Sequence, residues 1–76
     1  MIAEGEILFL ASLLARHPSQ IKVNKMGDDP MTFEIMACKD DLQQIMLREK
    51  VIRLMAGASG LIGIKLNFKE ICVTDS

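Results

Sequence analysis

The chain contains no tryptophan and no tyrosine, and its only aromatic residues are three phenylalanines among 76 residues. Phe9, Phe33 and Phe68 all fall at positions expected to face inward. If the chain bound a nucleic acid, its bases would therefore have to stack on arginine planes or apolar side chains instead of aromatic rings. A charge excess is also missing, because nine Lys and Arg oppose ten Asp and Glu. This balance excludes the globally basic footprint of a strong duplex DNA binder and confines any nucleic-acid role to a local patch.

Metal-ligating residues are scarce as well. Cys38 and Cys72 are far apart in the sequence without a CxxC motif, and His17 is the only histidine. We therefore expect no zinc or other metal site, no disulfide scaffold and no cofactor. Two buried free thiols, as in a cytoplasmic protein, are the expected state of the cysteines.

No motif gathers groups for catalysis. His17 precedes a proline at the end of an expected helix, where capping or solvent exposure is the usual role. The paired carboxylates Asp28-Asp29 and Asp40-Asp41 fall in a turn and at a helix start, both structural positions for aspartate. We therefore expect no enzymatic activity.

Long hydrophobic runs are absent too. The segment from Ile7 to Ala15 is interrupted only by Ser12 and is far shorter than the ~18 to 20 residues of a membrane span. The residues before it include Glu4 and Glu6 but no cation, which is unlike a secretory signal. We expect one domain over residues 1–76 that is located in the cytoplasm and does not bind membranes.

The spacing of apolar residues predicts the secondary structure. A broad apolar stripe predicts a helix over 1–16, which the His17-Pro18 pair ends. Period-two alternation predicts strands over 20–26 and 31–38, joined by the turn 27–30 into an antiparallel hairpin, and a last strand over 62–68 that ends or bulges near 69–70. Between the strands we expect helical residues from Asp40 or Asp41 to Ala58, with a capping box between Asp40 and Gln43 and a terminating glycine turn at 57–60.

The helical region between the second and third strands changes its apolar face. Leu42, Ile45 and Met46 lie on one side of a helical wheel, whereas the residues centred on Leu54 lie on nearly the opposite side. Two helices that change direction within 47–50 would let each side pack, because a single straight helix would have to be buried on both. The expected fold class is therefore α+β, with the order αββααβ and helices packed on one face of a three-stranded sheet.

This order in so short a chain resembles the type II KH fold, in particular the small stand-alone bacterial KH proteins of the KhpA kind. The resemblance covers roughly residues 7–69 and is carried by LASLLARHP, the alternating IKV strand, the GDDP turn and MTFEIMACKDDLQQIM. It implies a fold that binds single-stranded RNA. In that family a Gly-x-x-Gly loop clamps the nucleotide backbone, since a glycine lets phosphate approach the main chain.

The sequence departs from the family at that loop. The corresponding residues, 47–50, read Leu-Arg-Glu-Lys and contain no glycine, so the family's RNA contacts are not carried over residue by residue. A literal GxxG does occur at Gly57–Gly60. If it were the RNA-binding loop, the following residues would be helical and the sheet would keep two strands, so we favour a glycine-terminated helix there.

Two sets of residues are candidates for binding. Arg48, Lys50 and Arg53 are three cations near the start of the third expected helix, where they could meet RNA phosphates. Met36 and Cys38 are expected on the outward face of the second strand and could contact a partner. The first helix is apolar around most of its circumference, so a homodimer or a protein partner is expected to cover part of it.

Overall fold

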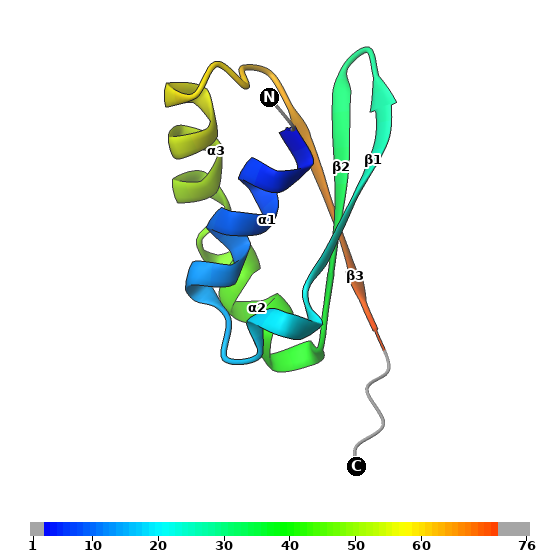
Figure 1. Ribbon diagram of the computed structural model, residues 1–76, viewed down its shortest axis with the longest axis vertical. Coiled ribbons are helices and arrows are strands. Elements are labelled where there is room, and N and C mark those ends of the chain that lie inside the picture. Colours follow the sequence, from blue (N-terminus) through cyan, green and yellow to red (C-terminus); the bar gives the residue numbers. More distant parts are fainter. Residues whose placement is uncertain (1–2, 72–76) are drawn as a thin grey trace.

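The computed structural model describes residues 3–71 and has three helices on one face of a three-stranded sheet (Figure 1). The elements follow the order αββααβ, which confirms the predicted α+β class. They are α1 (Ala3–Leu14), the 3-10 turn η1 (Pro18–Gln20), β1 (Lys22–Asp28), β2 (Met31–Ala37), α2 (Lys39–Leu47), α3 (Glu49–Ala58) and β3 (Lys65–Glu70).

The sheet has the strand order β1-β2-β3 and is mixed. β1 and β2 form the expected antiparallel hairpin, with a register shift between Lys25 and Gly27. β3 pairs parallel to β2, so the two helices α2 and α3 provide the crossover that a parallel pair requires. Figure 1 shows this helical layer on one side of the sheet and the opposite side open.

The core lies between the sheet and the helices. Phe33, Ile35 and Ala37 alternate along β2 and are fully buried, as their period of two predicts. The other buried apolar residues come from every layer: Ile7, Leu10, Ala11, Ile21, Leu42, Ile45, Ile52, Ala56, Ile64 and Leu66. β2 is the central strand and therefore supplies the largest buried side chain, Phe33.

The helical region breaks where the apolar face changes. Arg48 has φ −112° and ψ 22°, and it is both the C-cap residue of α2 and the N-cap residue of α3. The predicted change of direction within 47–50 is therefore confirmed. It lets α2 bury Leu42 and Ile45 and α3 bury Ile52 and Ala56, each against the same core.

The glycine pair after α3 terminates the helix. Gly60 has φ +95°, a left-handed conformation that an L side chain would strain. Its N–H donates to the Gly57 carbonyl at 3.0 Å, and the Leu61 N–H donates to the Ala56 carbonyl at 2.9 Å, which together make a Schellman motif. The preferred interpretation of Gly57–Gly60 is confirmed, and the alternative in which a helix follows it is wrong.

Several predicted element ends are corrected by the structure. α1 ends at Leu14, before the His17-Pro18 pair, and β1 begins at Lys22. β2 ends at Ala37, so Cys38 is the N-cap of α2 and does not lie on a strand face. No side-chain hydrogen bond caps α2, so the capping box predicted for Asp40 is wrong.

The last strand also begins later than predicted. β3 starts at Lys65 because Gly63, with φ +73°, leaves the extended region. Ile62 precedes the strand and is 84% exposed rather than inward. β3 ends at Glu70, as the shift in apolar spacing predicts. Cys72 and its predicted burial lie outside the described residues.

The expectation that all three phenylalanines face inward is wrong for one of them. Phe33 is buried and Phe68 half-buried, but Phe9 is 60% exposed on α1. Leu47 and Leu54 are also exposed, at 78% and 76%, so the second apolar stripe of the helical region is left uncovered by this chain. None of the helices described over residues 3–71 is long and apolar enough to cross a membrane.

Candidate functional site

The turn between α2 and α3 presents two of the three predicted cations to solvent. Arg48 sits at the helix break and Lys50 in the first turn of α3, and both are exposed. Among residues 3–71 their side chains take part in none of the hydrogen bonds or ion pairs found. Both charges are therefore available to an anionic ligand.

The third predicted cation, Arg53, is held by contacts with other residues of the same chain. The Arg53 guanidinium donates to Glu49 Oε2, at 2.8 Å from Nε and 2.7 Å from Nη2. Its Nη1 donates to the Ile64 carbonyl at 2.6 Å. Arg53 thus ties the first turn of α3 to the segment before β3, and a ligand would have to compete with these contacts for its charge.

An apolar hollow lies next to Arg48, one of the two available cations. Its walls are Gln43, Met46 and Leu47 on α2, and its volume is about 440 Å³. Since Leu47 directly precedes Arg48, the hollow and the cation are neighbours along the chain. A flat apolar group could pack in this hollow, and the Gln43 amide could donate and accept a hydrogen bond there.

A second, more polar hollow continues from the first. Its volume is about 490 Å³, and the two hollows share Gln43. The remaining lining residues are Leu14, Arg16, Asp40, Asp41 and Gln44, from the end of α1 and the start of α2. The two hollows therefore meet at Gln43 on α2.

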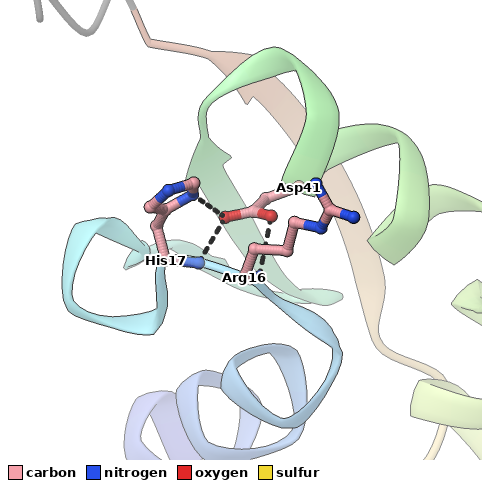
Figure 2. A network of polar contacts seen from close by, with 3 residues as sticks. All are labelled: Arg16, His17 and Asp41. Carbon is pink, nitrogen blue, oxygen red and sulfur yellow. Dashed lines mark hydrogen bonds and ion pairs between the residues drawn. The ribbon is translucent and has the colours of Figure 1, made fainter.

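Asp41, which lines the second hollow, is the centre of a polar network (Figure 2). Asp41 is 1% exposed in the first turn of α2, and its two carboxylate oxygens accept hydrogen bonds from the backbone N–H groups of Arg16 at 2.9 Å and His17 at 3.0 Å. The His17 ring approaches the same carboxylate, with Nδ1 3.6 Å from Oδ2. Asp41 therefore fixes the chain leaving α1 to the start of α2.

Asp41 keeps its charge in spite of its burial. Desolvation raises the pKa of this carboxyl, but the two backbone N–H donors, the Cys38 thiol and the charge of His17 outweigh it. The pKa of Asp41 therefore lies below its ordinary value of 3.8. The network stabilises the ionised form in the folded state.

This shift predicts a loss of stability in acid. A carboxyl whose folded-state pKa is depressed contributes stability above its unfolded pKa, and the contribution disappears as the pH falls through the folded-state value. We expect the free energy of unfolding to decrease as the pH is lowered below about 4, and to decrease less steeply in an Asp41→Asn variant. Urea unfolding curves from pH 3 to pH 6 measure both slopes. Equal slopes would contradict the prediction.

The two predicted partner-binding residues have different surroundings. Met36 lies on β2 between two inward residues and is half-buried on the outward face of the sheet. Cys38 is half-buried, and its thiol helps to lower the pKa of the Asp41 carboxyl. The structure thus separates a sheet-face residue from one that belongs to the Asp41 network.

The sequence argument missed the network because its members come from different segments. Asp41 and Cys38 flank the start of α2, and His17 follows α1. The His17 imidazole nitrogen, the Cys38 sulfur and an Asp41 carboxylate oxygen all lie within 4.8 Å of one another, so these three residues could hold a metal ion. Spacing along the chain carries no signal for this grouping, because His17 lies 24 residues before Asp41.

The chain matches no protein-family model, no curated protein and no solved structure.

Proposed function

We propose that this chain is a non-enzymatic binding module of type II KH form that binds single-stranded RNA on the outer side of the α2–α3 turn. The observation that carries the proposal is the apolar hollow of Gln43, Met46 and Leu47, whose last residue directly precedes the exposed cation Arg48, with the exposed Lys50 two residues further on. Phosphate would contact the cations, and a base would pack in the hollow. The αββααβ order and the helix break at the position of the family's loop support the same assignment.

The binding mode differs from the glycine clamp of that family. Leu47 occupies the first loop position, and its side chain is 78% exposed. Its Cβ keeps phosphate from approaching the backbone closely. Affinity must then come from side-chain cations and from apolar contact with bases, so we expect weak binding with a marked dependence on salt.

Charge reversal at the turn tests this function. A variant with both Arg48→Glu and Lys50→Glu should bind a short labelled single-stranded RNA several-fold more weakly. Its salt dependence should flatten by about 0.7 log units per lost phosphate contact. Fluorescence anisotropy titrations at three salt concentrations measure both effects.

A matched control separates the turn from the overall charge. Lys22→Glu with Lys65→Glu makes the same change in net charge on exposed positions of β1 and β3. We expect this control to bind RNA nearly as the unaltered chain does. The proposal fails if the unaltered chain binds no RNA at low salt, or if the control pair weakens binding as much as the turn pair.

A second candidate function, self-association, is favoured by a different surface. We define the α1–α3 patch as Phe9, Leu13, Val51, Leu54 and Met55, which are between 44% and 76% exposed. Glu6 on α1 accepts a hydrogen bond from the Ser59 hydroxyl at the end of α3, at 3.1 Å.

That hydrogen bond places the patch in the helical layer. Phe9 and Leu13 follow Glu6 by three and seven residues, so they lie on the side of α1 that faces α3. Met55 and Val51 precede Ser59 by four and eight residues, so they lie on the side of α3 that faces α1. Phe9, Leu13, Val51 and Met55 therefore border one seam between the two helices, and Leu54 adjoins Met55 on the outer side of α3.

The area of the patch fits a second copy of this chain. From the exposed fractions, the five residues offer on the order of 500 Å² of surface, toward the upper end of the largest patch on an ordinary monomer. Two copies related by a two-fold axis would bury roughly 1,000 Å² in total, near the lower limit of a specific interface. The oligomeric state in solution tests this candidate.

A further inference from the structure

We propose that His17, Cys38 and Asp41 form a binding site for a single divalent zinc ion at the junction of α1 and α2. This site is independent of the RNA-binding surface at the α2–α3 turn. The three residues offer one imidazole nitrogen, one sulfur and one carboxylate oxygen, and these atoms lie within 4.8 Å of one another. Zinc accepts this mixture of donors, and its complexes with three protein ligands hold a water in the fourth position.

The distances suit a tetrahedral ion. Zinc binds nitrogen and oxygen at about 2.0 to 2.2 Å and sulfur at about 2.3 Å, which sets neighbouring ligand atoms roughly 3.3 to 3.8 Å apart. His17 Nδ1 and Asp41 Oδ2 are 3.6 Å apart, within that range. Small movements of the exposed His17 ring and the Cys38 side chain would bring the third atom into place.

The site is supported from behind. The Asp41 carboxylate accepts two backbone N–H groups, which fix its orientation. A carboxylate has about four acceptor positions, so two remain for an ion. Hydrogen bonds of this kind orient metal ligands and are a regular part of metal sites.

The charges also balance. Binding removes the proton of the Cys38 thiol to solvent, and no oxidation or reduction is involved. The thiolate and the ionised Asp41 carboxylate then carry two negative charges, which one divalent ion neutralises, while the His17 imidazole is neutral. The His17 side chain is 57% exposed, so an ion can reach the site from solvent without unfolding the chain.

Cobalt is the spectroscopic probe for this site. Co²⁺ added to the reduced full-length chain should give a thiolate-to-cobalt charge-transfer band in the near ultraviolet that saturates at one ion per chain. Zn²⁺ should then abolish the band by displacement. The His17→Ala variant should weaken cobalt binding by at least about tenfold, since loss of even an outer partner of a metal site costs that much.

Two cysteine variants decide which thiol is the ligand. Cys38→Ser should abolish the charge-transfer band and still fold, because serine is a favoured N-cap residue and Cys38 caps α2. Cys72→Ser, the matched control, should keep the band. The proposal is overturned if the unaltered chain shows no band at saturating cobalt, if Cys38→Ser retains it, or if Cys72→Ser loses it.

Discussion

Replacing Asp41 by asparagine is expected to lower the free energy of unfolding by about 2 to 3 kcal/mol at neutral pH. The charged carboxylate accepts two backbone N–H groups in a position that is 1% exposed, and hydrogen bonds to charged groups contribute about 1.5 to 3 kcal/mol each. Asparagine keeps one acceptor oxygen, but its NH₂ group would face the second N–H. One part-buried backbone N–H would then lose its acceptor.

The expected loss is large relative to the stability of so small a domain. Domains carry about 0.05 to 0.15 kcal/mol of stability per residue, which gives roughly 4 to 11 kcal/mol for this chain. Urea unfolding at pH 7 measures the loss as a shift in midpoint, with the slope of the transition unchanged.

The neighbouring aspartate supplies the control for this prediction. Asp40→Asn removes the same charge from the same first turn of α2, but Asp40 is exposed. Its loss is expected to change the free energy of unfolding by no more than about 0.5 kcal/mol, as for most surface substitutions. Similar midpoint shifts for the two variants would show that Asp41 acts only through its charge near the helix end.

Local features of this fold could be predicted because their causes lie within a few neighbouring residues. The period-two pattern of β2 and the Asp29-Pro30 turn before it determine the hairpin, whose strands pair as far as Asp28 and Met31 rather than ending at the predicted turn 27–30. The helix break falls at Arg48, within the segment where the apolar face changes, but Leu54 on the second face is exposed, so burial of both faces is not its cause. Gly60 ends α3 because a residue without a side chain adopts a positive φ without strain.

Features that depend on distant segments could not be predicted in the same way. Asp41 looks like an ordinary first-turn aspartate until the chain after α1 is folded against it. Arg53 likewise looks like a free cation until Ile64 brings its carbonyl within 2.6 Å. Spacing along the chain does not encode such pairings, so the sequence identified the α2–α3 turn but missed the His17–Cys38–Asp41 cluster.

The prediction that the second apolar stripe would be covered was wrong in an informative way. Periodicity indicates that a face is apolar, but it does not state which surface covers it. Here the core is completed by Ile52 and Ala56 on one side of α3, and Leu54 on the other side is 76% exposed. The apolar pattern therefore exceeds what one copy of the chain can bury, which is the condition that favours association.

Leu54→Lys is expected to weaken self-association more than a hundredfold without destabilising the single chain. Leu54 is the most exposed residue of the α1–α3 patch, and a two-fold dimer that buries the patch would hold both copies of it in one interface. Each copy would lose about 1.5 to 3 kcal/mol of apolar burial and would place an ammonium group in the contact. A total above about 3 kcal/mol exceeds two powers of ten in the dissociation constant. Sedimentation velocity over a range of protein concentrations measures that constant.

Met26→Lys is the matched substitution outside the patch. Met26 is 57% exposed on β1, in the sheet layer rather than the helical layer (Figure 1). It adds the same charge to a similarly exposed apolar residue, so it should leave the dissociation constant within about threefold, as expected for a position that the interface does not desolvate. Dissociation of the dimer by both variants would place the contact elsewhere. An unaltered chain that stays monomeric at high micromolar concentration would remove self-association as a function.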